Sequence, residues 1–446
     1  MKVSFRSCCA AVLLATTSFA ARAQSPTPAV VSTATDTARI VLNPALIHPV
    51  SLQSFAAFRT AVQPLIKQMA GKKIVALGEG THGTAEFYRL RFWLTRILVE
   101  EHGFGQVALE NTYGDSQRLD EALHQSTLPE LKLLMQRDLL AMWQNREMAD
   151  MLAWMQAHNR RHRRQVHLAG IDAMFAQADA RYVHEQLAAR NPSLRPLAEQ
   201  LVKSAAYQDS VWMKMSDKSF KFPYKKWMAS GLAGYAAAND LLQALPAAHL
   251  PRRARERLAL TLLNSRMAFD EAYQVKTFKR ESSRDSVMAE MAKLLVRQPG
   301  SKLIIWAHDA HVSRLAALEQ GDGDDNGGGT GGFLERAFPG QYFVLGTSTA
   351  AGTFAATTNP FISPSSVMTA YPLQKPTAGS WEASLSYVAA PGFFFDTHAL
   401  GAQNLKRPHR VVGQTPDSQT TYAHYRLADA YDAFFFLRQT SAATPL

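Results

Sequence analysis

The sequence predicts an α/β fold in which helices flank a mainly parallel sheet. Three observations support this prediction. Short apolar segments alternate with segments of helical periodicity along most of the chain, a pattern typical of parallel sheets. The chain has 446 residues, 47% of them hydrophobic, which is enough to bury a large core. Several apolar segments run directly into ionisable residues, as expected where ligands bind at the carboxyl ends of parallel strands.

Each element follows from its local pattern. Short apolar runs predict six strands, at residues 74–77, 106–110, 166–171, 302–307, 342–347 and 433–437. Apolar residues spaced three or four apart predict helices between them, most clearly at residues 86–102, 115–124 and 142–159. Residues 181–295 carry Leu, Ala and Met at helical spacing without a clear strand. They predict a large helical insertion or lobe over the active end of the sheet, between two parts of the α/β core at residues 46–180 and 296–440.

The first 23 residues have the pattern of a secretory signal peptide. A basic start at Lys2 and Arg6 precedes an apolar stretch, Cys8–Phe19, and the small residues Ala21 and Ala23 frame a cleavage site. Residues 24–45, which begin with a stretch rich in Ser, Thr, Pro and Ala, are expected to form a flexible leader. The apolar stretch is too short to remain in a bilayer. We therefore expect a periplasmic or secreted bacterial protein without stable membrane insertion after cleavage.

The cysteine count and the net charge exclude several kinds of site and partner. Both cysteines, Cys8 and Cys9, lie in the predicted signal, so the mature chain has no disulfide, no thiol nucleophile and no cysteine metal site. The formal net charge is +11, and the one dense basic cluster, residues 160–164, follows a predicted helix. Cations are favourable at the end of a helix, where the dipole is negative. We therefore expect no nucleic-acid partner.

The turn after the first strand contains the most informative residues. Glu79 and His82 lie three residues apart among Gly78, Gly80 and Gly83, directly before a helix. Glycines let the backbone approach a ligand closely. A carboxylate and an imidazole at a strand end are the side chains that general acid–base catalysis requires. This turn is the first candidate catalytic site.

An arginine in a buried stripe extends this candidate site. Arg91 lies within the apolar stripe of the predicted helix 86–102, where a charge is costly unless it is paired. Glu79 and Glu110 are the candidate partners, because both follow predicted parallel strands and would lie at one edge of the sheet. The alternative is that Arg91 extends to the surface.

Two further strand ends supply ionisable groups. His308 and His311 follow the strand at 302–307 and converge if the chain turns after Ala307. Asp172 ends the strand at 166–171, and Arg284 begins a later helix, where it either faces the site or caps the helix. We predict Glu79, His82, Arg91, Glu110, His308 and His311 as catalytic and Asp172 and Arg284 as substrate-binding residues.

The segments that carry these residues also carry a resemblance to a known family. They are LGEGTHGTAEFYRLRFWLTRILVEEHGF at 77–104, VALEN at 107–111, MWQNREMADMLAWMQAHN at 142–159, GID at 170–172, RDSVMAEMA at 284–292, WAHDAHVSR at 306–314, GTSTAAGTF at 346–354 and DAFFFL at 432–437. The chain resembles the erythromycin esterase family over nearly all of its predicted mature length. It departs from the usual pattern at Gly80, where a bulkier or alanine-like residue is common, and at Asp309, where asparagine is frequent.

The resemblance implies hydrolysis of a small-molecule ester or lactone, a macrolide in the namesake, by water that the turn histidine, here His82, activates. In our hypothesis Glu79 orients His82, while Arg91 and one of His308 or His311 stabilise the oxyanion. No Ser-centred GxSxG motif is present to form a covalent intermediate, and no cofactor or metal is expected. Two alternatives stay open: a zinc or manganese hydrolase that uses the same histidines and carboxylates, and a periplasmic binding or polysaccharide-assembly protein.

Overall fold

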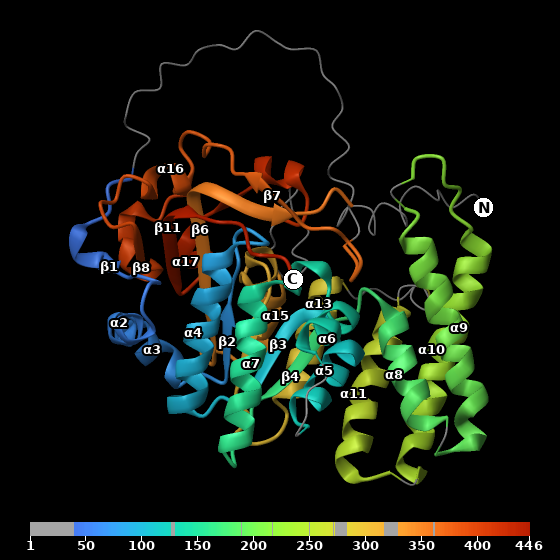
Figure 1. Ribbon diagram of the computed structural model, residues 1–446. Helices are drawn as coiled ribbons and strands as arrows, with labels where there is room; N and C mark the ends of the chain where they lie inside the picture. Colours follow the sequence, from blue (N-terminus) through green and yellow to red (C-terminus); the bar gives the residue numbers. More distant parts are fainter. Residues whose placement is uncertain are drawn as a thin grey trace.

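The computed structural model describes residues 40–125, 130–188, 190–215, 217–248, 250–270, 272, 283–315, 329–359 and 362–446. The predicted signal peptide and most of the predicted leader lie outside these residues. Figure 1 shows a central sheet with helices on both of its sides and a group of long helices beside it.

The main sheet has the strand order β1-β8-β11-β6-β2-β5-β3-β4, with β7 paired to β6. The central strands are parallel: β2 (Ile74–Leu77), β3 (Gln106–Thr112), β4 (His167–Asp172), β5 (Leu303–Trp306), β6 (Tyr342–Ala356) and β11 (Ala433–Thr440). Three strands pair antiparallel: β1 (His48–Pro49), β7 (Thr369–Pro372) and β8 (Gly392–Asp396). The predicted mainly parallel α/β fold is confirmed. A separate ribbon joins β9 (Arg407–Arg410) to β10 (Tyr422–Tyr425).

Helices cover both faces of this sheet. They are α2 (Phe55–Ala61), α3 (Gln63–Ala70), α4 (Ala85–His102), α5 (Tyr113–Leu123), α6 (Leu131–Asp138), α7 (Arg146–Arg161), α13 (Arg284–Leu295), α14 (Asp309–Val312), α15 (Thr330–Ala337), α16 (Trp381–Leu385) and α17 (Leu427–Ala430). Short 3-10 turns include η3 (Ala141–Trp143). No helix among the described residues combines the length and the apolar character that crossing a bilayer requires.

The core consists of two layers separated by the sheet, because successive side chains of a strand point to opposite faces. In β2, Val75 and Leu77 join a cluster that includes Leu94 of α4. Ile74 and Ala76 join a second cluster that includes Met288 of α13. Both faces of β2 are therefore buried, which explains its continuous apolar sequence.

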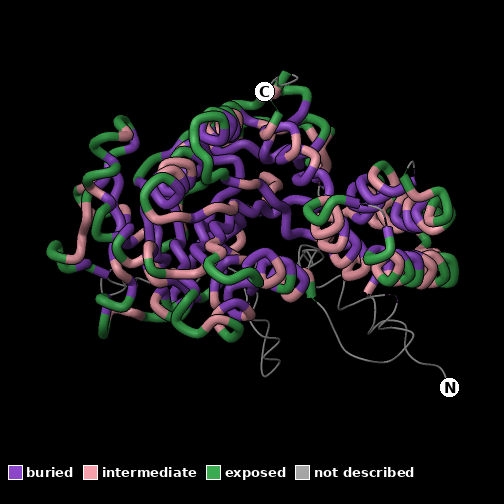
Figure 2. Tube along the Cα trace, turned by 90° about the horizontal axis from the view of Figure 1, so that it is seen from below, coloured by how far each residue is buried: buried purple, intermediate pink, exposed green. Residues whose placement is uncertain are grey.

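Four more helices form a lobe with a hydrophobic cluster of its own: α8 (Ala176–Leu187), α9 (Arg195–Trp212), α10 (Tyr224–Ala244) and α11 (Arg252–Ala268). The lobe lies beside the sheet, next to β4 and α5 (Figure 1). In Figure 2 a line of buried residues runs inside the lobe, apart from the buried residues of the sheet. Helix α13 packs on β4 and belongs to the sheet core.

Glycines fix both ends of α4, the helix that follows the Glu79 and His82 turn. Gly83 has φ 69° and lies against β6, so that a Cβ there would sit 2.1 Å from the carbonyl oxygen of Ala355. Gly103 has φ 75° and ends the helix in the left-handed conformation, a common helix C-cap. The amide of Ala443 also donates to the carbonyl of Gly83, at 2.8 Å. The start of α4 is thus held from two distant parts of the chain.

Candidate active site

Neighbouring parallel strands bring the predicted site residues to one edge of the sheet. In register, Leu77 of β2 pairs with Trp306 of β5, and Trp306 pairs with Leu109 of β3. Glu79, His308 and Glu110 follow these three residues by one or two positions. Asp172 is the last residue of β4, on the far side of β3. The structure thus gathers the carboxylates and imidazoles that the sequence placed on four separate segments.

The turn that carries Glu79 and His82 is held on both sides by hydrogen bonds from its backbone amides. The amide of Gly80 donates to Oγ1 of Thr347 at 2.8 Å, and the amide of His82 donates to the carbonyl of Val412 at 3.0 Å. A Cβ on Gly80 would lie 2.2 Å from the carbonyl oxygen of Thr347. Glycine at position 80 therefore follows from the close approach of β6.

Glu79 connects His82 to Arg91. Nδ1 of His82 lies 2.9 Å from Oε2 of Glu79, and Nη2 of Arg91 lies 3.1 Å from Oε1 of the same carboxylate. Glu79 and Arg91 have no solvent exposure, and His82 has 4%. Because an ionised carboxylate can only accept a hydrogen bond, Nδ1 of His82 donates in this contact, and Nε2 is the ring nitrogen that Glu79 does not bind. Of the two partners that the sequence allowed for Arg91, the structure selects Glu79.

Arg91 lies behind Glu79 within an aromatic enclosure. Its guanidinium carbon is 4.8 Å from the ring centre of Tyr88, 5.3 Å from that of Trp143 and 4.9 Å from that of Trp306. Contacts with ring faces stabilise a buried guanidinium. This placement differs from our expectation that Arg91 contacts an oxyanion, since a wholly enclosed side chain acts through Glu79.

His308 faces His82 but has both ring nitrogens engaged. The two ring centres are 4.6 Å apart. Nε2 of His308 donates to the carbonyl of Val412 at 3.1 Å, and its Nδ1 accepts the amide of Ala310 at 3.2 Å. Burial, together with the nearby His82, holds the pKa of His308 well below its ordinary value. His308 is therefore neutral and lines the site next to His82.

Glu110 and Asp172, both buried, form an ionic group with Arg284, which is partly exposed. Nη2 of Arg284 lies 2.9 Å from Oε1 of Glu110 and 2.6 Å from Oδ2 of Asp172, and its Nε lies 3.2 Å from Oδ1 of Asp172. Oε2 of Glu110 accepts the amide of His308 at 2.9 Å. Burial opposes ionisation of Glu110, but His311 and Arg284 outweigh it and hold its pKa well below the ordinary value. Arg284 thus links Glu110 of β3 to Asp172 of β4 through one side chain.

His311 completes the site with a partner that the sequence analysis left unassigned. Its Nδ1 lies 2.8 Å from Oδ1 of Asp285, and its Nε2 lies 3.4 Å from Oε1 of Glu110 and 3.1 Å from Nη1 of Arg284. Burial and Arg284 oppose protonation, but Asp285 and Glu110 outweigh them and raise the pKa of His311 to about 10. Asp285 lies in the first turn of α13, where an acidic residue is common. The sequence therefore gave no signal that separated this role from helix capping.

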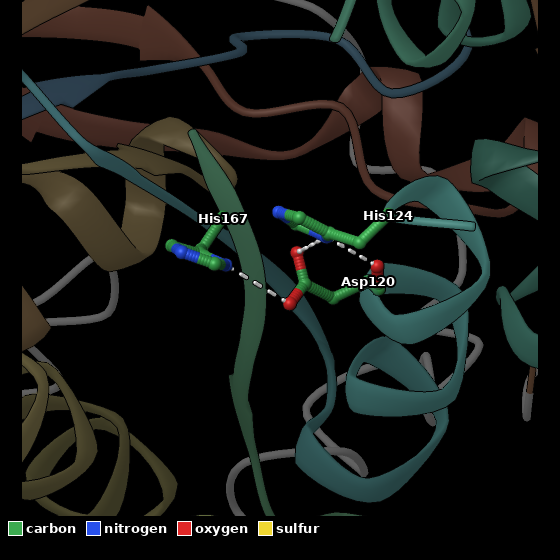
Figure 3. Close-up of side chains that lie close together, drawn as sticks. All are labelled: Asp120, His124 and His167. Carbon is green, nitrogen blue, oxygen red and sulfur yellow. Dashed lines mark hydrogen bonds and ion pairs between the residues drawn. The ribbon is translucent and has the colours of Figure 1, made fainter. Parts of the chain in front are cut away.

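A second group of histidines and a carboxylate lies at the opposite edge of the sheet. Asp120, His124 and His167 bring their ligand atoms within 4.8 Å of one another (Figure 3). It is the one such group found among the described residues. Nη2 of Arg257 already lies 3.2 Å from Oδ2 of Asp120, and the two imidazole rings stack at an interplanar angle of 14°. A cation in that position and parallel rings suit an ion-pair cluster better than convergent metal ligands.

The edge of the sheet at Glu79 and His82 combines an imidazole that a carboxylate orients with a second imidazole, His311, that is protonated. Glu79 holds the His82 ring through Nδ1 and leaves Nε2 available, an arrangement that suits a general base. His311 and Arg284 are cations with side-chain exposures of 16% and 32%, which suits them to stabilise a developing negative charge. An acyl transfer to water needs both functions.

The chain is similar to known proteins of one family. The sequence matches the erythromycin esterase family over residues 99–440. It is 26% identical to erythromycin esterase type I of Escherichia coli over 290 residues, which cover 59% of this chain and 70% of that protein. It is 22% identical to erythromycin esterase type II of Escherichia coli over 417 residues, 85% of this chain and 93% of that protein.

Two solved structures share the fold. A succinoglycan biosynthesis protein has a TM-score of 0.71 at 18% identity, with 90% of this chain and 96% of that chain covered. A mutant of the erythromycin esterase EreC in its open conformation has a TM-score of 0.66 at 19% identity, with coverage of 89% and 98%. The family match covers most of the sequence and includes the strand ends of Glu110, Asp172 and His308. This chain therefore belongs to the erythromycin esterase family.

Proposed function

We propose that this protein is an exported esterase that hydrolyses an ester or lactone of a small molecule, with a macrolide lactone as one candidate substrate, by direct attack of water. Membership of the family makes the chain a hydrolase of ester bonds. The observation that carries the mechanism is the 2.9 Å contact between Glu79 and Nδ1 of His82. It leaves Nε2 of His82 as the base.

His82 removes the proton from water in the first step. Glu79 keeps Nδ1 protonated and stabilises the imidazolium that forms when Nε2 takes the proton. The water oxygen attacks the ester carbonyl carbon, and the carbonyl oxygen becomes an oxyanion. General-base assistance of this kind contributes about 10² to 10⁴-fold to the rate. Arg91 fixes the other oxygen of Glu79 and so sets the direction of the imidazole.

His311 and Arg284 stabilise the oxyanion. Both are cations at this edge of the sheet, whereas Arg91 is enclosed. The tetrahedral intermediate then collapses, the bond to the leaving oxygen breaks, and His82 returns its proton to that oxygen. The products are a carboxylic acid and an alcohol. The proton that His82 took from water thus leaves on the alcohol, and no covalent enzyme intermediate is required.

The proposal of export rests on the sequence alone. Lys2, Arg6 and the apolar stretch Cys8–Phe19 support a signal peptide with cleavage after Ala23. Expression in a bacterium, followed by cell fractionation and mass measurement of the protein, tests it. A periplasmic or secreted protein that begins at Gln24 is expected. A cytoplasmic protein that retains residues 1–23 would refute export without affecting the esterase proposal.

The esterase proposal is tested by mass spectrometry of the products. The purified protein is incubated with erythromycin and with a panel of simple esters and lactones, with and without a chelator. We expect a gain of one water that the chelator does not prevent. His82→Ala should abolish it while the circular dichroism spectrum stays native, and His424→Ala, at an exposed histidine, should not. Loss of activity in chelator, restored by zinc or manganese, would instead support the metal-dependent alternative.

A further inference from the structure

A second group of buried ionisable side chains packs against the turn of Glu79 and His82. The mechanism above does not use this group. It joins Asp309 of α14, His409 of β9 and Glu382 of α16, none of which has solvent exposure. Nδ1 of His409 lies 2.8 Å from Oε1 of Glu382, and its Nε2 lies 3.8 Å from Oδ2 of Asp309. One imidazole therefore stands between two buried carboxylates.

The surroundings make this histidine a cation at neutral pH. Burial opposes its charge, but Asp309 and Glu382 outweigh burial and raise the pKa of His409 to about 9. The ring is packed among Tyr425, Tyr431 and Phe434, at centre distances of 5.4 to 5.9 Å. Their apolar faces weaken solvent screening, so that the charge of His409 offsets two carboxylates that would otherwise repel each other.

Other charged groups act on the two carboxylates from neighbouring elements. Arg410 of β9 favours the ionised form of Glu382. Glu79 opposes ionisation of Asp309, whose pKa burial already raises. The phenol rings of Tyr425 and Tyr431 also lie next to His409. Burial next to Asp309 raises the pKa of Tyr431. His409 is thus the cation that lies between the two carboxylates.

Asp309 connects the group of Asp309, His409 and Glu382 to the catalytic turn through three contacts. Its Oδ2 accepts the amide of Thr347 at 2.8 Å, and Thr347 in turn accepts the amide of Gly80. The amide of Asp309 donates to the carbonyl of Glu79 at 3.0 Å. Its Oδ1 lies 1.8 Å from the position that a Cβ of Gly78 would occupy. The carboxylate of Asp309 therefore packs against the backbone that positions Glu79.

His409 has a second connection to the site through the chain that follows it. Val412, three residues on, accepts the amide of His82 and donates its own amide to the carbonyl of Gly80 at 3.0 Å. Its carbonyl also accepts Nε2 of His308. Movement of β9 would therefore move the backbone that holds both histidines of the site.

We propose that Asp309, His409 and Glu382 form a positioning relay, in which the charge on His409 holds Asp309 against the catalytic turn and keeps Glu79 aligned with His82. The proposal rests on the proposed esterase function and adds positioning residues to it. None of the three contacts the reacting atoms. Their effect on hydrolysis passes through the geometry of the turn, where a displacement of about 1 Å is enough to cost about 100-fold in rate.

Three variants test the relay by kinetics. His409→Gln removes the charge and leaves two facing carboxylates, and we expect kcat to fall about 10 to 100-fold with KM within about twofold of the unmodified enzyme. The neutral triple variant Asp309→Asn, His409→Gln, Glu382→Gln removes the repulsion, and should fold and recover part of kcat. His167→Gln, at the Asp120 cluster on the opposite edge of the sheet, is the control and should keep full activity.

The pH profile separates positioning from general stability. In the unmodified enzyme we expect kcat to begin to fall near pH 9, as His409 loses its proton. The triple variant should lack that limb and keep only the later fall, near pH 10, that the loss of charge on His311 produces. A folded His409→Gln protein with unchanged kcat, or a triple variant that keeps the limb, would overturn the relay. The ¹⁵N chemical shifts of His409 give a reading that needs no substrate: a neutral ring at pH 7 would also refute it. If the unmodified protein hydrolyses no ester, the esterase proposal fails. The protonation state of His409 at pH 7, measured by NMR, is then the remaining test of the relay.

Discussion

Replacing Arg91 by methionine should test how strongly the enclosed ion pair supports the catalytic turn. Methionine has a similar length and packs well against aromatic rings, so the contacts with Tyr88, Trp143 and Trp306 are largely kept. The change that remains is the loss of the positive charge 3.1 Å from Oε1 of Glu79. Removing one partner of a buried pair leaves an uncompensated charge and costs about 3–5 kcal/mol. We expect that loss in the free energy of unfolding.

A double-mutant cycle measured by urea titration isolates the interaction. Glu79→Gln should also cost about 3–5 kcal/mol, because it leaves Arg91 buried alone. The double variant should lose clearly less than the sum, since both charges are then absent. Arg96→Met on the same helix breaks an ion pair with Glu100 that is about one-third exposed, and should cost about 0.5 kcal/mol or less. Additivity of the Arg91 and Glu79 effects within about 0.5 kcal/mol would refute the reasoning.

Three further results are expected. The kcat/KM should fall as pH rises through about 10, because His311 then loses its charge; its pKa is raised on folding, so its contribution to stability is also lost in that direction. Asp285→Asn should move this alkaline limb to lower pH, and a pH profile with an unmoved limb would contradict the assigned contact. Gly80→Ala should lower kcat at least about tenfold in steady-state assays, because its Cβ would meet the carbonyl of Thr347, whereas Gly71→Ala, which meets nothing within 4 Å, should not.

The sequence predicted the parallel strands because each is apolar on both faces and begins or ends next to a helix signal. It did not predict the antiparallel strand β8, Gly392–Asp396, although its run of three phenylalanines is apolar. A short apolar run alone does not distinguish a strand from a buried helix. The paired strand β11 supplies the missing information, because Phe435 lies opposite Phe394.

At the site, adjacency in sequence decided what could be predicted. Glu79 and Arg91 lie on one strand–turn–helix unit, so the buried arginine pointed to Glu79 as one of two candidate partners. His409 is different, because it lies about 100 residues after Asp309 in a segment without a clear helix or strand pattern. Its pairing with Glu382 and Asp309 depends on how the β9–β10 ribbon packs against the sheet. Likewise, the enclosure of Arg91 depends on Trp143 and Trp306, which come from separate elements.

The sheet order also determines when the site can form during synthesis. The turn of Glu79 and His82 leaves the ribosome early, but its supports are residues 309, 345–347, 355, 412 and 441–443. Contacts so far apart along the chain form slowly. The nascent protein therefore exposes an unpaired β2 until β5 and β6 have been made, more than 200 residues later. The turn lacks its last supports until residues 441–443 follow, more than 300 residues later. Unpaired strand edges in such an intermediate are prone to aggregate. We therefore expect the yield of active protein to depend on how well that unfinished sheet is protected, and not only on the stability of the finished enzyme.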